Sequence, residues 1–547
     1  MMTIICRMWL KITLDKLLNS LRKRVWFLRT KKVSSRPSLA SLLGEPESET
    51  EAKKEMLDIA LLLRRHGVIP RGVIHVGAHQ AGELEDYLKI GFAKILYIEA
   101  NPALIPALLK KAQVYPGKVF ILHAAVSDSD GMGRLRVTSM NQSSSILPLG
   151  KHLEIYPSIK EVSQVEVHFR RLDTLLAEEG FTASDFNFLN LDIQGAELMA
   201  LRGAESLLTT IEAINTEINL QELYQGAALL PDVEFFMSQR GFNRAAMVTP
   251  YHPSWGDAFY VRKPVVAMTT LGSNGRFANQ LFQYLFLQLV ARRQSALVQV
   301  PGWVGNELFG FNDPEPLLTF KEWREPVAEL GERNAWLGCD WVHHFKEKDP
   351  AFSSVDYCGY YMGHSHDLIS DRDFIRKLFR FVPRFVESAN QRLSTLRACR
   401  PKILAVHLRR GDYGYAYYFR APCAWYEAWI REQGLNPAEW IIYICSENPT
   451  AYRHRFTGFK TADANDLKAN AALATYLDFY VLTQADGVLI ANSSFSFMAS
   501  MLNEKSSFFA RPCAEKERLV SFDPWDALAV LRHQPSPAVH RRFIEED

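Results

Sequence analysis

Short runs of mostly apolar residues, separated by turn-forming and helical stretches, recur along the chain. An apolar run of this length, ending in glycine or a charged residue, is typical of a strand buried in a parallel sheet. Such runs lie at residues 73–76, 95–98, 119–122, 186–191, 211–216, 265–270, 403–406, 441–446 and 487–490. Because predicted helices follow several of them, the fold class is predicted to be α/β.

The length of the chain sets the expected number of domains. A chain of 547 residues is too long for one hydrophobic core, so two or three domains are expected. A hydrophobic content of 48% and a charged content of 23% are typical of ordinary globular proteins. The formal net charge of +2 gives no reason to expect a nucleic-acid partner.

The seven cysteines are scattered, odd in number and without a C-x-x-C spacing. This pattern indicates reduced thiols in a cytoplasmic protein, with neither a disulfide framework nor a zinc site.

The first thirty residues lack the uninterrupted apolar run of a spanning helix and the cleavage site of a signal peptide. Leucine and valine recur there at helical spacing, with Lys and Arg mostly off that stripe. Such a basic amphipathic helix, residues 1–32, either lies on the inner face of the membrane or docks on its own domain. Residues 34–51, rich in Ser, Pro and Glu, are predicted to be a linker, so residues 1–52 stand apart from the domains.

A nucleoside-binding pattern opens the first domain. Gly77 and Ala78 form a turn of small residues between the strand at 73–76 and a predicted helix. Small residues let a ligand approach the backbone. The strand at 95–98 ends in Glu99, which is placed there to accept both hydroxyls of a ribose.

Asp128 follows the next predicted strand, at 119–122. Two interpretations stand for this residue. It either lies near an adenine ring or forms, with Asp130, the polar turn of a hairpin.

Seven segments carry a family likeness across most of residues 70–262: HVGAHQAGE, YIEANP, AAVSD, NQSSSIL, RRLDTLL, NLDIQGAEL and NTEINLQELYQGAALLPDVEFF. Together they resemble the FkbM family of S-adenosylmethionine-dependent O-methyltransferases. The resemblance implies a Rossmann-like methyltransferase domain over residues 53–264 that acts on a hydroxyl, often of a sugar. The residues assigned to S-adenosylmethionine are Gly77, Ala78, Glu99, Asn101 and Asp128.

Two positions depart from that family pattern. His75 stands where many relatives carry an acidic residue, and Ala81 replaces a glycine often found in the turn. The amino group of the methionine part of the cofactor is therefore expected to be held differently, and His75 is assigned no role.

Methyl transfer to a hydroxyl needs an aligned sulfonium and acceptor and a base that receives the proton. Asp192 follows a predicted strand, with Glu197 and Glu217 near it in the pattern. Asp192 either takes part in catalysis or acceptor binding, or caps a helix over residues 193–201. His79 is the alternative base, and the sequence does not decide between them.

In the second domain the strand at 403–406 leads into a loop carrying His407, Arg409, Arg410 and Asp412. Guanidinium groups match phosphate oxygens in geometry and charge, and the carboxyl end of a parallel strand faces a ligand crevice. The other interpretation is a surface loop whose charges pair with one another.

Polar residues open or end elements in three further stretches. They are Asn279 and Gln280 at the start of a predicted helix, Ser446 and Glu447 at the end of a predicted strand, and Asn492, Ser493, Ser494 and Ser496 at the start of another helix. Hydroxyl and N–H groups at such positions hold a sugar or diphosphate, or simply cap the helix.

These stretches, in order over residues 271–510, resemble the α-1,2-fucosyltransferases of glycosyltransferase family 11, whose central motif is His-x-Arg-Arg-Gly-Asp. The resemblance implies a GT-B fold of two Rossmann-like halves over residues 265–547 and inverting transfer from GDP-fucose. It assigns Arg409, Arg410 and Asp412 to the reacting centre and the other polar residues to the substrates. Ala278 stands where the family usually has a glycine.

Asp371 and Asp373 form a D-x-D string, which suggests a metal-bridged nucleotide sugar. Ser370 with Asp373 also matches the amino-terminal capping box of a helix over residues 374–379, and this interpretation is favoured. The two arginines are then expected to stabilise the departing diphosphate in place of a metal, so no metal is predicted.

The sequence therefore predicts a bifunctional glycan-modifying enzyme. The second domain transfers fucose to a sugar hydroxyl in α-1,2 linkage, and the first methylates a sugar hydroxyl of an oligosaccharide or polysaccharide, in either order. The alternative is an active fucosyltransferase whose methyltransferase-like domain has lapsed and serves glycan binding or membrane tethering. The turn with Glu99 argues against lapse, whereas His75 leaves room for it.

Overall fold

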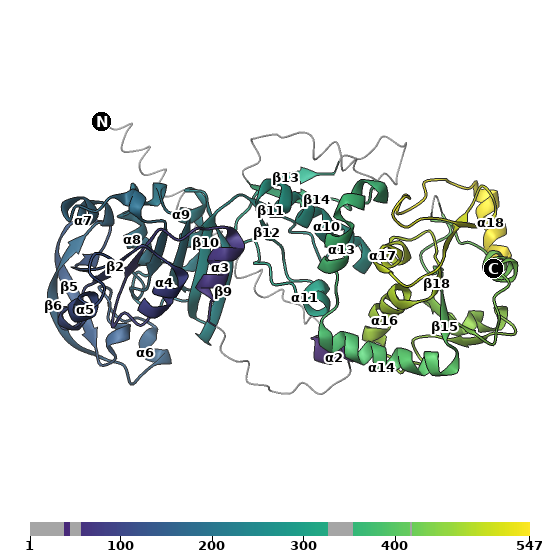
Figure 1. The fold of residues 1–547 in the computed structure, drawn as a ribbon, viewed down its shortest axis with the longest axis horizontal. Helices are drawn as coiled ribbons and strands as arrows, with labels where there is room; N and C mark the ends of the chain where they lie inside the picture. Colours follow the sequence, from purple (N-terminus) through teal and green to yellow (C-terminus); the bar gives the residue numbers. More distant parts are fainter. Residues whose placement is uncertain (1–37, 44–55, 326–353, 416–417) are drawn as a thin grey trace, which may run out of the picture.

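The protein is represented by a computed structural model that describes residues 38–43, 56–325, 354–415 and 418–547. Three large sheets with their helices follow one another along the long axis of the molecule (Figure 1). The helix predicted for residues 1–32 lies outside the described residues. Within the described part, no helix combines the length and apolar content needed to cross a membrane.

Seven strands form the sheet of the first domain, in the order β3-β2-β1-β7-β8-β10-β9. Their bounds are β1 Gly72–Val76, β2 Lys94–Glu99, β3 Val119–His123, β7 Phe188–Leu191, β8 Ala213–Asn219, β9 Phe242–His252 and β10 Trp255–Arg262. The first five in the order are parallel, and β10 is antiparallel to both neighbours. The order reverses at β1 and β7, so their carboxyl ends border the crevice where open α/β sheets bind ligands.

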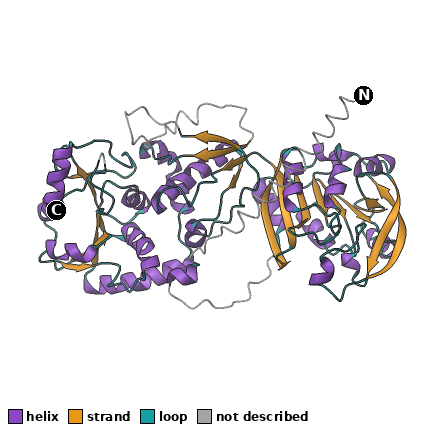
Figure 2. Ribbon diagram, turned by 180° about the vertical axis from the view of Figure 1, so that it is seen from behind, coloured by secondary structure: helices purple, strands orange, loops and turns teal. Residues whose placement is uncertain are grey.

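Helices cover both faces of this sheet (Figures 1 and 2). One face carries α3 (Ile59–His66), α4 (Leu84–Ile90) and α5 (Ile105–Ala112), and the other carries α7 (Leu172–Glu178), α8 (Glu197–Arg202) and α9 (Leu230–Ser238). Successive residues of a strand point to opposite faces of the sheet, so alternate residues pack against the two sets of helices. The continuous apolar runs in the sequence reflect this burial on both faces.

A small sheet of three strands borders the large one, in the order β4-β6-β5. Its strands are β4 Ala125–Val126, β5 Gly131–Thr138 and β6 Glu161–Arg170. The connection from β5 to β6 contains the 3-10 turn η1 (Asn141–Ser143) and the helix α6 (His152–Ile155). This connection supplies much of the lining of the cavity described below.

Two α/β halves make up the second domain. The first has a parallel sheet in the order β12-β11-β14-β13, and the second has six strands in the order β17-β16-β15-β18-β19-β20. The strands are β11 Val265–Ala267, β12 Leu297–Gln299, β13 Lys321–Arg324, β14 Ser354–Cys358, β15 Lys402–Leu408, β16 Trp440–Ser446, β17 Lys460–Ala462, β18 Gly487–Leu489, β19 Phe509–Cys513 and β20 Arg518–Ser521. The predicted class, α/β with two Rossmann-like halves in GT-B fashion, is confirmed.

Helices surround these two sheets. They are α10 Phe277–Gln294, α11 Val304–Phe309, α13 Arg372–Leu378, α14 Pro383–Cys399, α15 Cys423–Glu432, α16 Ala471–Gln484, α17 Ser494–Leu502 and α18 Pro537–Glu545. Most of them share one large apolar core, and α15 and α18 pack in a second apolar cluster of the second half. Thirteen of the 18 residues of α10 are buried, because it packs between the halves rather than on a surface.

Part of the predicted linker is a structured element. Residues of α2 (Leu39–Leu43) pack against α14 and α16, and the side chain of Leu42 is fully buried in the core of the second domain. The backbone N–H of Leu39 donates to Glu307 at 2.9 Å, and Asn470 donates to the carbonyl of Leu42 at 3.2 Å. Prediction of a plain linker over residues 34–51 is therefore wrong at α2, because its leucines have an apolar site to enter.

A buried ion pair lies where the first domain meets the second. Arg244 of β9 contacts Glu234 of α9 at 2.6 Å, with both side chains about 5% exposed or less. The same guanidinium donates to the carbonyl of Glu315, and Gln299 of β12 donates to the carbonyl of Arg244. These bonds link the edge strand of the first sheet to the second domain.

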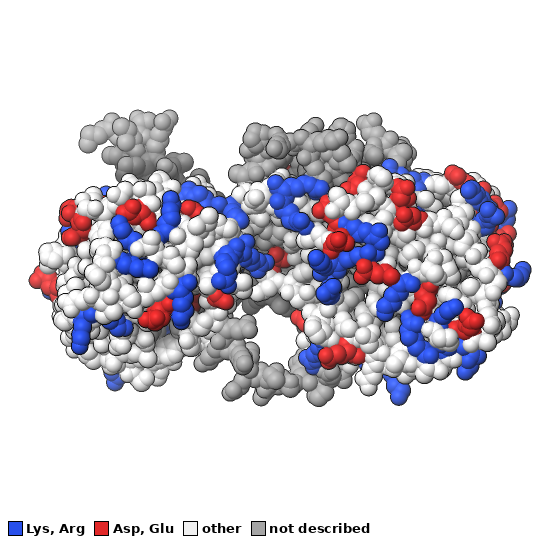
Figure 3. Space-filling view, in the orientation of Figure 1, with Lys and Arg blue, Asp and Glu red and all other residues white. Residues whose placement is uncertain are grey.

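Charged side chains of both signs are interspersed over the described part of the face shown in Figure 3. This mixture agrees with the nearly balanced total of 63 basic and 61 acidic residues.

Candidate active sites

A cavity of about 1260 Å³ opens at the carboxyl ends of the parallel strands in the first domain. Its lining comes from the loops after β1, β2 and β7, from the β5–β6 connection, and from β8, β9 and β10. Cavities for one drug-sized ligand usually measure about 300–1,000 Å³. The volume therefore suits two ligands, such as a nucleoside cofactor and an acceptor.

The turn after β1 is held tightly against the neighbouring strands. Gly77 has a φ of +87°, and a Cβ there would lie 1.8 Å from the carbonyl oxygen of Asp192. The N–H groups of Gly77 and Ala78 both donate to the carbonyl of Ile98. Ala81 has a φ of +50°, a left-handed conformation that costs about 1–2 kcal/mol without glycine. The departure from the family glycine at Ala81 therefore falls at a position where glycine is the unstrained residue.

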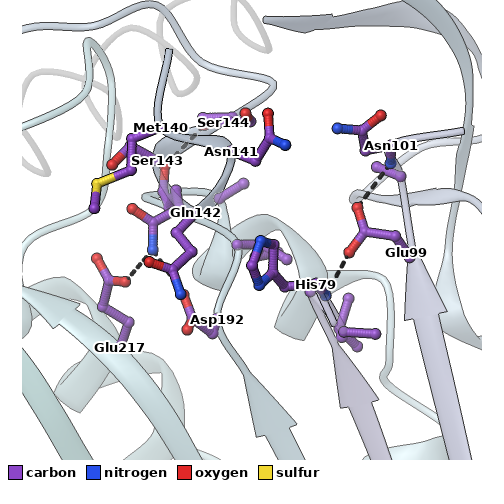
Figure 4. A pocket seen from close by; sticks show the side chains of 18 of the residues that line it. His79, Glu99, Asn101, Met140, Asn141, Gln142, Ser143, Ser144, Asp192 and Glu217 are labelled. Carbon is purple, nitrogen blue, oxygen red and sulfur yellow. Dashed lines mark hydrogen bonds between the residues drawn. The ribbon is translucent and has the colours of Figure 1, made fainter. Parts of the chain in front are cut away.

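Glu99 is fixed by two backbone groups at the end of β2. Its Oε2 accepts the N–H of His79 and its Oε1 accepts the N–H of Asn101, both at 2.7 Å. The side chain is 8% exposed and lines the cavity. Figure 4 shows Glu99 and Asn101 on one side of the cavity, with Asp192 and Glu217 on the other and His79 between them.

This arrangement fits S-adenosylmethionine. Each carboxylate oxygen has two lone pairs, so Glu99 keeps acceptor capacity for two ribose hydroxyls after bonding to its backbone partners. Gly77 and Ala78 also line the cavity, so the turn borders the space for the rest of the cofactor. When bound, S-adenosylmethionine supplies an electrophilic methyl group on a sulfonium.

Gln194 joins two carboxylates on the far side of the cavity. Its Nε2 donates to Asp192 at 2.7 Å and to Glu217 at 2.5 Å, while its Oε1 accepts the hydroxyl of Tyr224 at 2.7 Å. Gln194 adopts a φ of +57°, and its hydrogen bond to Glu217 joins its side chain to β8. Asp257 of β10 lies opposite Glu217 in the strand register and also lines the cavity. The sequence prediction missed Gln194, Tyr224 and Asp257.

Burial and repulsion by a neighbouring charge raise the pKa values of two of these carboxyl groups, Asp257 and Glu217. Burial, and then the charge of Asp192, raise the pKa of Asp257 to about 7. The same causes raise the pKa of Glu217 well above its ordinary value. Groups with pKa values near neutrality are suited to receive a proton from an acceptor hydroxyl.

Asp192 is not a helix cap. The helix α8 begins at Glu197 with Ala196 as its N-cap residue, so the predicted helix over residues 193–201 is too long at its start. Glu197 instead accepts the N–H groups of Ile193 and Gly195 and shapes this turn. The capping interpretation of Asp192 is therefore wrong, and Glu197, unlike Asp192 and Glu217, does not line the cavity.

His75 is 2% exposed at the floor of the cavity. Its Nδ1 lies 3.2 Å from the hydroxyl of Tyr87, and Asn190 donates to that hydroxyl at 2.9 Å. Burial lowers the pKa of His75, so the ring is neutral at pH 7. A neutral, hydrogen-bonded imidazole thus stands at the position where the family pattern leads one to expect an acidic residue.

Asp128 is exposed and does not line the cavity. Ala124, Ala125 and Val126 line it instead at this point of the chain. Asp130 accepts the N–H of Arg171 and the hydroxyl of Thr174. The structure therefore does not bring Asp128 together with Glu99 and Asn101.

A second cavity, of about 430 Å³, lies between the two halves of the second domain. The first half contributes the start of α10, and the second contributes the loops after β15 and β16 and the start of α17. The predicted residues that line it are Asn279, His407, Arg409, Asp412, Ser446, Glu447, Ser493 and Ser494. Ala278 lines it as well.

One ion pair and one hydrogen bond cross between the halves at this cavity, and two further ion pairs lie within the second half. Arg409 pairs with Asp412 at 2.7 Å and also with Glu447. Arg276, which precedes α10, pairs with Asp412 at 3.1 Å. The hydroxyl of Ser494 donates to Asn279 at 2.6 Å. The loop charges thus do pair with one another, but around a cavity rather than on an open surface.

Arg410 points away from this cavity. Its guanidinium contacts the carboxylate of Asp547 at 2.7 Å, and Arg410 is absent from the cavity lining. Three other predicted residues, Gln280, Asn492 and Ser496, are also buried behind the lining. Ser496 lies 2.7 Å from Nδ1 of His407, whose pKa burial lowers to about 4.

The D-x-D string does not form the predicted capping box. Asp371 itself is the N-cap residue of α13, without a side-chain capping bond, and it pairs with Arg293 at 3.4 Å. The helix begins at Arg372 rather than at residue 374, because the preceding 3-10 turn η4 (Ser365–Asp371) runs directly into it. Among the described residues, no group of three His, Cys, Asp or Glu side chains is arranged to hold a metal ion.

Comparison with known proteins bears on the first cavity. Residues 75–244 match the family model of the methyltransferase FkbM domain. Over 162 residues the chain is 31% identical to the 2-O-methyltransferase NoeI of Sinorhizobium fredii (strain NBRC 101917 / NGR234), covering 28% of this chain and 65% of that protein. The chain thus spans just under two thirds of this relative. These matches support a methyltransferase domain in the amino-terminal half.

Solved structures give weaker likenesses. A methyltransferase FkbM from Methylobacillus flagellatus KT aligns with a TM-score of 0.23 at 15% identity, covering 35% of this chain and 43% of that chain. The NodZ α-1,6-fucosyltransferase, co-crystallized with GDP, aligns with a TM-score of 0.31 at 12% identity, covering 48% of this chain and 98% of that chain. Scores at this level assign no function.

Proposed function

We propose that the chain is a bifunctional enzyme of glycan modification. The first domain transfers a methyl group from S-adenosylmethionine to a sugar hydroxyl, and the second transfers fucose from GDP-fucose to a sugar hydroxyl with inversion. The observation that carries the methyltransferase part is one cavity with Glu99 on one side and Asp192, Glu217 and Asp257 on the other. The FkbM match over residues 75–244 agrees with it.

In the first domain, the carboxylates of the cavity and Gln194 orient the acceptor, and one of the carboxylates receives its proton. The acceptor oxygen forms a bond to the methyl carbon, the carbon–sulfur bond breaks, and the hydroxyl proton passes to a carboxylate. Asp192 and Asp257 are the candidate proton acceptors, because both line the cavity beside the buried Glu217. Gln194 holds Asp192 and Glu217 at fixed distances, so the acceptor meets a prearranged set of oxygens.

In the second domain Arg409 is the group that meets the diphosphate. It lines the cavity, and its guanidinium already bridges two carboxylates, Asp412 and Glu447. A diphosphate that displaces either carboxylate receives a planar pair of N–H donors. The charge that develops on the leaving GDP is then stabilised by a cation fixed in place. The α-1,2 linkage rests on the resemblance of the central motif alone.

The test is to incubate the full chain with S-adenosylmethionine, GDP-fucose and oligosaccharide acceptors, and to analyse the products by mass spectrometry. Mass gains of one deoxyhexose and one methyl group are expected, each dependent on its own donor. A lapsed first domain gives the deoxyhexose gain alone and no binding of S-adenosylmethionine. The geometry of Glu99 favours the active form, since backbone N–H groups fix both of its oxygens at the lining of the cavity.

A further inference from the structure

The lining of the first cavity has an unusual charge composition. Its acidic members are Glu83, Glu99, Asp192, Glu217 and Asp257. Across the described residues that line the cavity there is no lysine and no arginine. Burial lowers the pKa of two of its histidines, His75 and His152, so neither ring carries a charge at pH 7.

This composition suits some ligands and opposes others. A sulfonium cofactor is cationic and is attracted by the carboxylates. A phosphate group brought into the same space meets acidic side chains and, among the described lining residues, finds no guanidinium or ammonium to bond, so its binding is disfavoured. The second cavity provides a contrast, because Arg276 and Arg409 line it.

Aromatic side chains form an outer wall of the first cavity, on the side of Asp257 where we place the methyl acceptor. This wall consists of Tyr156, Tyr251 and Trp255. The rings of Tyr251 and Trp255 stack with centroids 5.6 Å apart and an angle of 19° between their planes. The indole N–H of Trp255 donates to the hydroxyl of Tyr156 at 3.2 Å, and all three residues line the cavity. Tyr251 is 53% exposed, which places this wall at the mouth.

One residue of the wall and one of the carboxylates belong to the same strand. Trp255 and Asp257 are two residues apart on β10, so their side chains lie on the same face. Between them, Gly256 lets β9 approach closely, since a Cβ there would lie 1.9 Å from the carbonyl oxygen of Val248. A flat apolar surface beside hydrogen-bond acceptors matches a sugar ring, which has C–H groups on its face and hydroxyls around its rim.

His152 adds a polar atom without a partner. The side chain is 4% exposed, and its Nδ1 makes no hydrogen bond to any described residue. It lies beside the wall, 5.2 Å from the ring of Tyr156 between centroids. A hydroxyl of the acceptor is a suitable partner for a neutral ring nitrogen.

We infer that the methyl acceptor is an uncharged sugar ring stacked on Trp255, and that sugar phosphates and nucleotide sugars are excluded. Methylation then follows a glycosyl transfer, because that transfer is the class of reaction that frees a sugar from its diphosphate. This inference rests on the proposed methyltransferase function of the first domain and fixes the order that the sequence leaves open.

The test uses the full chain with S-adenosylmethionine and four probes that share one sugar. Methyl β-L-fucoside and 2′-fucosyllactose are uncharged, whereas β-L-fucose 1-phosphate and GDP-fucose carry phosphate. We expect kcat/KM for methylation to be at least about 100-fold higher for the better uncharged probe than for either phosphate. Equal or faster methylation of either phosphate probe overturns the inference.

A binding measurement separates this inference from the proposed function. Calorimetry with S-adenosylhomocysteine measures binding at the cofactor site. Saturation-transfer NMR measures whether the sugar probes bind, and excess GDP is added to fill the proposed donor site in the second cavity. Failure of S-adenosylhomocysteine to bind overturns the proposed function and the inference with it. If it binds while no uncharged sugar is bound or methylated, the inference alone is wrong.

Three variants test the wall. Trp255→Leu should raise KM for the uncharged probe by about 3- to 10-fold, the scale of an aromatic contact, without changing the affinity for S-adenosylhomocysteine. Trp255→Phe keeps a ring and should recover most of the loss. Both substitutions of Trp255 also remove its hydrogen bond to Tyr156. Tyr156→Phe removes the same bond but keeps the indole ring, so it is the matched control. A KM in Trp255→Leu equal to that of the unchanged protein contradicts stacking on this residue.

Discussion

Arg410 and Asp547 form a buried ion pair, with Nη2 and Oδ1 2.7 Å apart and the side chains 7% and 1% exposed. Asp547 also contacts Arg420 and accepts the N–H of Cys423. The neighbouring Arg409 turns the other way and lines the cavity between the halves. The two adjacent arginines therefore do different work: Arg409 faces the ligand, and Arg410 holds the loop onto the segment that follows α18.

The first prediction is that Arg409→Lys impairs fucosyl transfer while leaving the fold intact. Lysine keeps the charge but loses the planar fork, so the variant should lose about 2–4 kcal/mol of transition-state stabilisation. The loss should appear in kcat as well as in affinity for GDP-fucose, because charge on the leaving group peaks in the transition state. Steady-state kinetics with a thermal unfolding scan measures both.

Asp547→Ala is the counterpart to this variant. Removing one partner of a buried ion pair leaves a charge unpaired and should lower the free energy of unfolding by about 3–5 kcal/mol. Urea titration with activity measurements at low temperature separates lost folding from lost turnover. The first prediction is contradicted if Arg409→Lys turns over GDP-fucose as fast as the unchanged protein, and Arg409 then lies outside the active site.

The second prediction concerns the ribose of S-adenosylmethionine. Glu99→Gln replaces a charged acceptor by an amide and should weaken binding by about 1.5–3 kcal/mol, the scale of a hydrogen bond to a charged group. Glu85→Gln, on α4 and outside the cavity lining, is the matched control and should bind normally. Fucosyl transfer should survive in both variants. Unchanged affinity of Glu99→Gln in calorimetry means that this carboxylate does not hold the cofactor.

The sequence predicted those parts of the fold and site that depend on local pattern. The strands that end at Glu99, before Asp192 and before Arg409 lie within a few residues of their predicted bounds, because apolar runs and turns report burial directly. Asp257 has no such signal. It joins Glu217 only through antiparallel pairing of β10 with β8, which brings together residues far apart in the chain.

Two interpretations of the sequence failed for different physical reasons, one local and one tertiary. A helix cap was one of the two interpretations of Asp192, but the buried carboxylate of Glu197 satisfies the N–H groups of the turn and the helix begins only at Glu197. Arg410 looked equivalent to Arg409, but its partner Asp547 lies 137 positions away. Interactions over such distances are fixed by tertiary packing, and local propensity carries no trace of them.

The third prediction uses the raised pKa of Asp257, about 7 in the folded protein against an ordinary value of 3.8. Because the folded state holds this proton more tightly than the unfolded state, stability should fall as the pH rises from about 4 to 7. Each unit of pKa difference corresponds to about 1.4 kcal/mol. Asp257→Asn should flatten this part of the curve, measured by urea titration at several pH values. An unchanged pH profile in the variant contradicts the shift.

The rate of methylation should rise with pH, in the direction opposite to that of the stability. A carboxylate that receives the hydroxyl proton must be deprotonated first, so kcat/KM should rise through about pH 7 if Asp257 is the base. Asp257→Asn should lose activity and this pH dependence together. Loss of activity with the dependence retained would identify Asp192 as the stronger candidate.

The fourth prediction concerns residues 1–32, which we propose contact an anionic membrane surface. Deleting them should abolish sedimentation with anionic liposomes, and salt should weaken the binding of the full chain. Activity on a soluble acceptor should be kept. Equal sedimentation of both forms would end the membrane hypothesis.

The fifth prediction separates that segment from α2, a few residues further along the chain. Leu42 is fully buried against α14 and α16, so Leu42→Ala leaves a cavity in the core of the second domain. The free energy of unfolding should fall by about 2–5 kcal/mol. Leu61→Ala is the control, because Leu61 is 53% exposed on α3, and its effect should stay within about 0.5 kcal/mol. Deletion of residues 1–32 should leave stability unchanged, whereas deletion of residues 1–43 should destabilise the protein as Leu42→Ala does. If Leu42→Ala is as stable as the control, α2 is not part of this core, and the segment before the first domain is a linker throughout.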